Sequence, residues 1–204
     1  MLSIKTGIAG FLLIATSLPI RAQTVTPNQM FGTTPYESPS CNTPDYHELD
    51  FMHGRWALKI LKDGKWVPGG YADYKPALGG CISFEYVSFE NWGDFYKTLS
   101  GRNGFAGFAI NTFDKEAMNW RQVWVDDLGT VITTFRGRKF GDGMRFVGHA
   151  PNDNGTELQK FEYIITGEDI RELTYDMSTD GGKNWTQIAR IQMIRQADKP
   201  LVPK

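Results

Sequence analysis

Short apolar segments separated by turn residues make up most of this chain, and no long helical period runs between them. We expect each segment to be a strand, and the strands cover residues 55–61, 65–78, 81–90, 105–113, 120–126, 130–138, 144–149, 157–166, 170–178 and 185–195. Strands joined by short turns form an antiparallel meander, and closing the meander removes its exposed edges. The sequence therefore predicts an all-β, antiparallel up-and-down barrel of about eight to ten strands.

The segment 120–126 indicates what this barrel encloses. Side chains alternate between the two faces of a strand, which here carry Trp120, Gln122 and Trp124 on one side and Arg121, Val123 and Val125 on the other. Neither face is clearly polar, as expected for a wall with apolar surroundings on both sides. The pattern favours a closed barrel around a lined cavity.

The first 22 residues have the features of a secretory signal peptide. Lys5 precedes an apolar run over residues 7–14, Pro19 interrupts the segment, and Ala22 offers a cleavage site. The run is shorter than the ~20 residues that a membrane-spanning helix needs, and the alternative is an uncleaved N-terminal anchor. We expect a periplasmic or secreted protein with no integral membrane segment after cleavage.

The charge of the mature chain is mildly negative. Removing residues 1–22 removes Lys5 and Arg21, so that 20 Lys and Arg remain against 23 Asp and Glu, a net charge of −3. This balance gives no electrostatic basis for binding nucleic acid. The histidines are not spaced like zinc ligands, so we expect no metal site; they are His47, His53 and His149.

Cys41 and Cys81 are the two cysteines of the chain. An even pair in an exported protein predicts a disulfide bond, and the alternative is two free thiols.

The remaining organisation follows from composition. Residues 23–43 contain spaced prolines and no apolar period, and we expect a disordered tether there. Residues 44–196 form one domain, which begins with a short helix between an N-cap at Thr43 and an end at Gly54. A polar tail covers residues 197–204. Within the domain, 91–103 is the longest stretch for which we expect irregular structure.

Gly54-Arg55-Trp56 lies where the expected helix meets the first strand. In this position it resembles the Gly-x-Trp signature of the calycin barrels, which include lipocalins, fatty-acid-binding proteins and nitrobindin-like proteins. In lipocalins a basic residue of the last strand packs over that Trp, and the resemblance implies this structural role for Arg195 or Arg190. A haem site of the nitrobindin-like kind is not expected, because the last strand has no His. His149 is then a solvent-exposed residue at a strand end, and no cofactor is expected.

Residues 49–195 as a whole look similar to a bacterial exported family of unknown function with a lipocalin-like barrel. The matching pieces are Leu49-Asp50-Phe51-Met52-x-Gly54-x-Trp56, Leu78-Gly79-Gly80-Cys81 with Glu85, Phe113-Asp114 followed by Trp120-x-Gln122-x-Trp124-Val125-Asp126 and Gly129, and Ser178-Thr179-Asp180-Gly181-Gly182-Lys183-Asn184-Trp185. The family carries Tyr at the position of Phe113 and an aromatic residue at the position of Met52. The resemblance implies a calycin-like barrel and export, and it implies no activity.

Ser178-x-Asp180-x-Gly182-x-x-Trp185 also matches the Asp-box turn of sialidase-type propellers. A propeller needs several copies of the motif, and the chain has one. We interpret the motif as a hairpin turn. The Ser and Asp side chains bind backbone amides, Gly182 supplies a positive φ, and Trp185 packs beneath the turn.

Polar side chains on otherwise apolar strands are candidates for orienting a ligand in the lumen, and Glu85 and Gln122 are of this kind. Glu85 has the alternative of pairing with an Arg on a neighbouring strand. Asp126 is expected to cap the turn towards Gly129. Aromatic candidates either line a cavity or fill a core, and they are Trp120, Trp124, Tyr86 and Tyr175.

No motif for a catalytic nucleophile or a phosphate-binding loop is present. The leading hypothesis is non-catalytic binding of a small, mostly apolar molecule in the lumen. A second hypothesis is hydrolysis or isomerisation of a small hydrophobic substrate by Glu85 and a neighbouring polar group. A third is a structural or interaction module of the cell envelope, with a filled barrel and an exposed apolar patch around residues 89–96.

Overall fold

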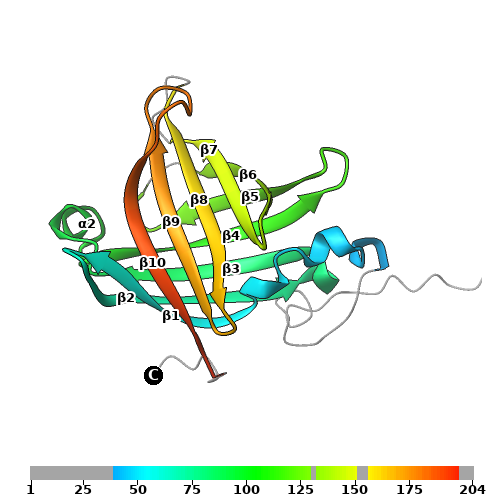
Figure 1. Cartoon of the computed structure of the whole chain (residues 1–204), viewed down its shortest axis with the longest axis horizontal. Helices are drawn as coiled ribbons and strands as arrows, with labels where there is room; N and C mark the ends of the chain where they lie inside the picture. Colours follow the sequence, from blue (N-terminus) through cyan, green and yellow to red (C-terminus); the bar gives the residue numbers. More distant parts are fainter. Residues whose placement is uncertain (1–38, 130–131, 151–155, 198–204) are drawn as a thin grey trace, which may run out of the picture.

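Ten antiparallel strands form a closed barrel in the computed structural model of the chain, which describes residues 39–129, 132–150 and 156–197 (Figure 1). Every strand pairs with its neighbours in sequence, and β1 (Gly54–Lys62) also pairs with β10 (Thr186–Gln196). The predicted all-β, up-and-down barrel is therefore confirmed. The signal peptide, residues 23–38 of the tether and residues 198–204 of the tail lie outside the described residues.

The strands follow the alternation of apolar side chains closely. The strands between the closing pair are β2 (Lys65–Ala77), β3 (Ile82–Glu90), β4 (Gly104–Asp114), β5 (Asn119–Asp126), β6 (Thr133–Phe140), β7 (Gly143–His149), β8 (Leu158–Gly167) and β9 (Ile170–Ser178). The first hairpin turns at Asp63 and Gly64, which both have a positive φ, as a two-residue turn between twisted strands requires.

The helical elements differ from those expected. They are the 3-10 turns η1 (Pro39–Cys41), η2 (Pro44–His47), η3 (Asp50–Met52) and η4 (Leu78–Gly80), and the α-helix α2 (Asp94–Ser100). The helix expected up to Gly54 is thus split into η2 and η3, and the Thr43 side chain makes no capping hydrogen bond. The stretch 91–103 was wrongly expected to be irregular, because α2 lies within it.

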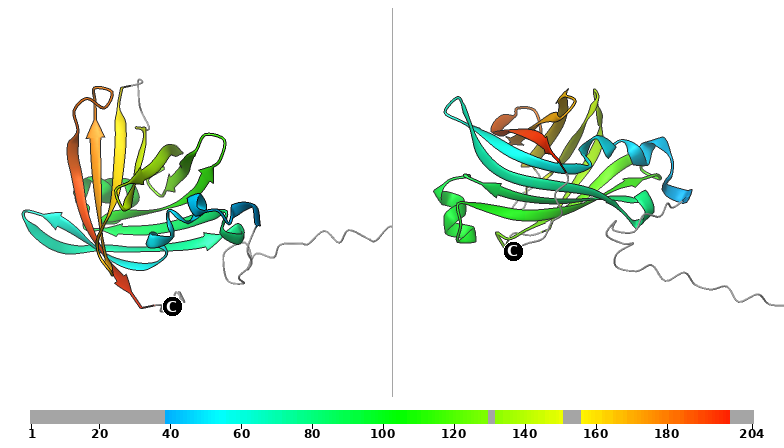
Figure 2. Two further views of the ribbon diagram at one scale, coloured as in Figure 1. Left: turned by 45° about the vertical axis from the view of Figure 1, so that its right-hand side comes forward. Right: turned by 90° about the horizontal axis from the view of Figure 1, so that it is seen from below.

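The two ends of the barrel are covered by different elements. Figure 2 shows η2 and η3 at one end, which we call the closed end, and α2 near the other end. None of the helices among the described residues has the length and apolarity needed to cross a bilayer.

The indole of Trp56 is the centre of the closed end. It is fully buried, and its Nε1 donates a hydrogen bond to the carbonyl oxygen of Met52 at 2.7 Å. The guanidinium of Arg195 lies 4.2 Å from the centre of the ring and donates to the carbonyl oxygen of His53 at 2.6 Å. Arg190, the other basic residue considered for this place, pairs with Glu172 instead.

Gly54 makes this arrangement possible. Its φ is +120°, and a Cβ at this position would lie 2.5 Å from a guanidinium nitrogen of Arg195. A side chain here would therefore displace Arg195 from Trp56 and strain the backbone.

A disulfide bond joins Cys41 and Cys81, as predicted, with 5.0 Å between their Cα atoms. It links η1 to the residue after η4, so the end of the expected tether, residues 39–43, is part of the ordered domain. The prediction that the tether extends to residue 43 is wrong for these five residues.

The hairpin between β9 and β10 contains the Asp-box motif. One carboxylate oxygen of Asp180 accepts hydrogen bonds from the Ser178 hydroxyl at 2.8 Å and from the backbone amides of Lys183 and Asn184. Gly182 has a positive φ, and its carbonyl oxygen accepts a hydrogen bond from the Trp185 indole at 3.0 Å. These contacts hold the turn itself, since every partner lies within it.

Candidate ligand-binding cavity

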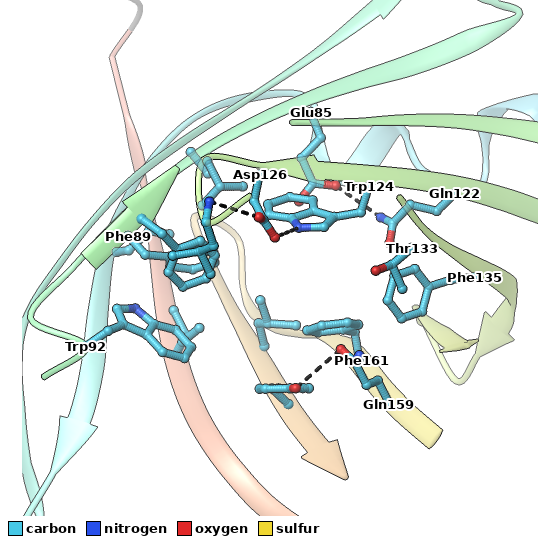
Figure 3. Close-up of a pocket in the computed structure, with 18 of the residues that line it drawn as sticks. Glu85, Phe89, Trp92, Gln122, Trp124, Asp126, Thr133, Phe135, Gln159 and Phe161 are labelled. Atoms are coloured by element: carbon cyan, nitrogen blue, oxygen red, sulfur yellow. Dashed lines mark hydrogen bonds between the residues drawn. The ribbon is translucent and has the colours of Figure 1, made fainter. Parts of the chain in front are cut away.

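A cavity of about 550 Å³ occupies the barrel interior on the side of α2 (Figure 3). Its walls come from the inward-facing positions of nine strands and from the loop and helix between β3 and β4, namely Leu58 of β1, Tyr74 of β2, Val87 of β3, Phe105 of β4, Trp124 of β5, Phe135 of β6, Phe161 of β8, Tyr175 of β9, Met193 of β10, Trp92 and Tyr96. The lumen is therefore not filled by side chains, which argues against the filled barrel of the third hypothesis.

The polar end of the cavity is a hydrogen-bonded group around Glu85. The Tyr74 hydroxyl donates to Glu85 Oε1 at 2.9 Å, and the Gln122 amide donates to Glu85 Oε2 at 3.2 Å. The same amide nitrogen donates to the side-chain oxygen of Asn111 at 2.9 Å. No Arg in the described part of the chain pairs with Glu85, and the donors that hold this carboxyl group are neutral.

Burial decides the protonation of Glu85. The side chain is almost completely buried, and the loss of hydration raises its pKa to about 7, although hydrogen bonds from Tyr74, Asn111 and Tyr163 act in the opposite direction. The pKa values of Tyr74 and Tyr163 are raised well above 10 by burial and by the nearby Glu85. Glu85 thus changes its charge near neutral pH beside two phenols that stay neutral.

Aromatic rings form much of the remaining wall. Phe161 and Tyr175 stack with 4.8 Å between ring centres, and Phe135 meets Phe161 edge-on at 5.3 Å. The Tyr175 hydroxyl donates to the Gln159 side chain at 3.3 Å. Figure 3 shows Phe135 and Phe161 on one side of the cavity, and Phe89 and Trp92 across from them.

The aromatic residues of the loop and helix between β3 and β4 cluster at the end of the cavity next to α2. Trp92 lies 4.9 Å from Phe89 and 5.5 Å from both Tyr96 and Phe105, measured between ring centres. The apolar patch that we expected around residues 89–96 is therefore packed on itself and lines the cavity. Leu99 of α2, which also lines the cavity, remains about half exposed.

Asp126 acts as a turn cap, in agreement with our interpretation. Its Oδ1 accepts a hydrogen bond from the Leu128 amide at 3.1 Å, and its Oδ2 accepts one from the Trp124 indole at 3.0 Å. Asp126 also lines the cavity, so the same carboxylate fixes the turn and the position of Trp124.

Four of the six residues chosen from the sequence as ligand contacts line this cavity. They are Glu85, Gln122, Trp124 and Tyr175. Trp120 and Tyr86 do not. Since successive side chains of a strand point to opposite faces, Tyr86 lies on the outer surface if Glu85 points inward, and its ring is 5.8 Å from that of Tyr71.

Trp120 does face inward, but it lies beyond the polar group, at the closed end. Its indole donates to Glu48 Oε2 at 3.1 Å, and it borders a separate hollow of about 420 Å³ together with Arg138 and Lys139. Trp120 is therefore not placed to contact a ligand in the lumen, contrary to our expectation from the sequence.

Three residues of the cavity were not predicted from the sequence. Tyr74 and Tyr163 complete the polar group, and Trp92 lines the cavity next to α2. Tyr74 is the direct partner of Glu85 in the register of β2 and β3, so the pairing of these two strands is the signal that could have identified it. Among the described residues, no group of three or more His, Cys, Asp or Glu side chains is placed to hold a metal ion. His149, at the end of β7, is exposed.

No protein-family model matches this chain, and no curated protein sequence matches it.

Proposed function

We propose that this protein is an exported, calycin-type carrier that binds a small, mostly apolar molecule in its lumen without transforming it. The observation that carries the proposal is the cavity of about 550 Å³, whose size and mostly apolar walls with a few convergent polar groups are typical of small-molecule sites. The Cys41–Cys81 disulfide supports export, because such bonds persist in oxidising compartments.

An acid–base enzyme is the second candidate, and the pKa of about 7 at Glu85 is the observation in its favour. Such chemistry usually requires a second group that titrates in the same range. The nearest hydroxyls, those of Tyr74 and Tyr163, have pKa values well above 10. This difference supports binding over catalysis.

Occupancy of the cavity is tested with N-phenyl-1-naphthylamine, a neutral apolar probe that becomes fluorescent in apolar sites. We compare two variants that make the same substitution. Val87→Trp fills the lumen, because Val87 lines the cavity, whereas Val123→Trp places the ring on the outer face of β5, where Val123 is 38% exposed. We expect saturable binding to the wild type and to Val123→Trp, and a loss of about tenfold or more in Val87→Trp.

Equal binding by both variants would remove the lumen as the site. Near-ultraviolet circular dichroism checks that Val87→Trp is folded, and Ala72→Phe, which fills the cavity from β2, is the second blocking variant. Native mass spectrometry of protein purified from its own host then reports whether a bound molecule accompanies it.

A further inference from the structure

The charged side chains that line the cavity all have the same sign. They are Glu85, Asp126 and Glu157, and among the described residues no Lys, Arg or His lines the wall. A cavity that receives an anion normally supplies a cationic partner or a cluster of donors for it. The described part of this lumen supplies no cation, and its convergent donors, such as Tyr74 and Gln122, already bind the carboxylate of Glu85.

The basic residues of the neighbouring strands are used elsewhere. Lys160 and Arg145 lie on the outer surface of β8 and β7 and pair with Glu162, and Arg190 pairs with Glu172. Lys160 alternates with the lining residues Gln159 and Phe161, which places its ammonium outside the lumen. The barrel wall therefore separates these three cations from the cavity. The arginines on the inner face, Arg171 and Arg195, lie over the ring of Trp56 at the closed end and do not line the cavity.

The aromatic walls add a second property that favours a cation. The negative face of an aromatic ring attracts ammonium groups, most strongly where water is excluded. Six of the aromatic side chains that line the cavity are Phe89, Trp92, Phe105, Trp124, Phe135 and Phe161. Rings of this kind together with carboxylates are the usual receptors of organic ammonium ions.

We propose that the ligand of this lumen is an organic cation with an apolar body, whose ammonium group lies at Glu85 and whose body lies along the aromatic walls. This proposal rests on the proposed function and narrows it to one class of ligand. It excludes fatty acids and other anionic amphiphiles, since their charge would be buried beside carboxylates without a counter-ion.

Glu85 is a better partner for the cation than Asp126. Both oxygens of Asp126 already hold a backbone amide and an indole that fix the turn. Glu85 is only 3% exposed, where low dielectric strengthens its attraction to a cation, and its hydrogen-bond partners are neutral side chains that fix no turn.

Binding of a cation should also depend on pH. A bound ammonium stabilises the ionised form of Glu85, whose pKa in the empty cavity is about 7, so binding below that pH releases a proton. The groups around the carboxyl are Tyr74 of β2, Asn111 of β4, Gln122 of β5 and Tyr163 of β8, and the other carboxyls of the cavity are Asp126 and Glu157. A permanently charged ligand should therefore bind several-fold more tightly at pH 8 than at pH 6.

The test compares three ligands with the same chain and different charges, which are octyltrimethylammonium, 1-octanol and octanoate. Calorimetry at pH 8 measures their affinities for the mature protein. We expect the ammonium to bind most tightly, 1-octanol less tightly, and octanoate about tenfold or more weaker than the ammonium. Octanoate binding as tightly as the ammonium would overturn the proposal.

Glu85→Gln identifies the group responsible. This variant should lose the preference for the ammonium and its pH dependence while binding 1-octanol as the wild type does. Glu116→Gln, in the exposed turn between β4 and β5, is the matched control and should change nothing. Retained ammonium preference in Glu85→Gln would remove Glu85 as the partner.

The result for 1-octanol separates the two proposals. If the alcohol binds but charge has no effect on affinity, the cation proposal fails and the carrier proposal stands. If neither the three ligands nor the naphthylamine probe binds, both proposals fail.

Discussion

Arg195 of the last strand lies face-on against the indole of Trp56 in the first strand, with 4.2 Å between the guanidinium carbon and the ring centre. The two residues are also direct partners in the β1–β10 register. Arg195 also donates a hydrogen bond to the carbonyl oxygen of His53, the residue after η3. The same side chain therefore links the closing β1–β10 pair to the end of η3.

The first prediction concerns this contact. Arg195→Lys should lower the free energy of unfolding by about 1–3 kcal/mol, because an ammonium cannot stack on the ring and reach the carbonyl at the same time. Arg190→Lys, on the exposed surface of the same strand, should change it by less than about 0.5 kcal/mol. Urea denaturation followed by Trp fluorescence measures both. Equal effects of the two variants would contradict the role given to Arg195.

The second prediction concerns the disulfide. The cysteines are 40 residues apart in sequence, so the double variant Cys41→Ser, Cys81→Ser should lose ~4 kcal/mol of stability through the freer unfolded chain. Adding dithiothreitol to the wild type should cause a similar loss and should leave the double variant unchanged. Wild-type stability that does not respond to complete reduction, verified by thiol titration, would argue against this account.

The third prediction is a pH dependence of stability. Burial raises the pKa of Glu85 from 4.5 to about 7, so between these values the folded state binds the proton more tightly than the unfolded chain does. Ionisation therefore opposes folding. Its cost is absent below pH 4.5, grows as the pH rises, and is complete above pH 7, where it amounts to roughly 3 kcal/mol.

Glu85→Gln removes this titration. Its stability relative to the wild type should increase by about 3 kcal/mol between pH 4.5 and pH 8, as measured by urea denaturation at a series of pH values. Glu116→Gln should show no such trend. A stability difference between Glu85→Gln and the wild type that stays constant over this range would show that Glu85 is not the group that titrates.

The fourth prediction concerns the position of Trp124. A Cβ on Gly107 would overlap the Trp124 ring and lie 2.6 Å from the carbonyl oxygen of Val125. Gly107→Ala should therefore displace the indole, weaken its hydrogen bond to Asp126 and cost about 1–3 kcal/mol.

Gly167→Ala is the control for this change, since its Cβ would meet Ile170 at an ordinary 3.6 Å. Near-ultraviolet circular dichroism and Trp fluorescence report the movement of the ring. Identical spectra of Gly107→Ala and the wild type would mean that the cavity wall adapts without moving Trp124.

The alternation of side chains was sufficient to predict the barrel, because a period of two determines which residues share a face. It also placed Gln122 and Trp124 on the same face of β5, and the structure shows that this face is the inner one. Depth along the strand is not contained in that period. Trp120 is on the inner face but does not line the cavity, because Gln122 of the polar group lies between it and Trp124 along β5.

Two other errors have different causes. Choosing both Glu85 and Tyr86 as lumen residues conflicts with the alternation itself, and the structure resolves the conflict in favour of Glu85. The helix α2 was overlooked, and its 7 residues are too few for a helical period to be recognised in the sequence. Gly101, in the left-handed conformation with φ 74°, ends the helix, and Asp94 begins it.

The closed ring of strands also has a consequence for folding. Nine of its pairings join strands that follow one another in the chain, and they can form locally as hairpins. The pairing of β1 with β10 is the only one in the described barrel that joins distant segments, and it bears the largest loop-closure entropy. Until β10 is in place, the growing sheet keeps two unpaired edges, and such edges template aggregation. The eleven residues of β10 therefore protect the rest of the sheet from aggregation, because their pairing removes both unpaired edges.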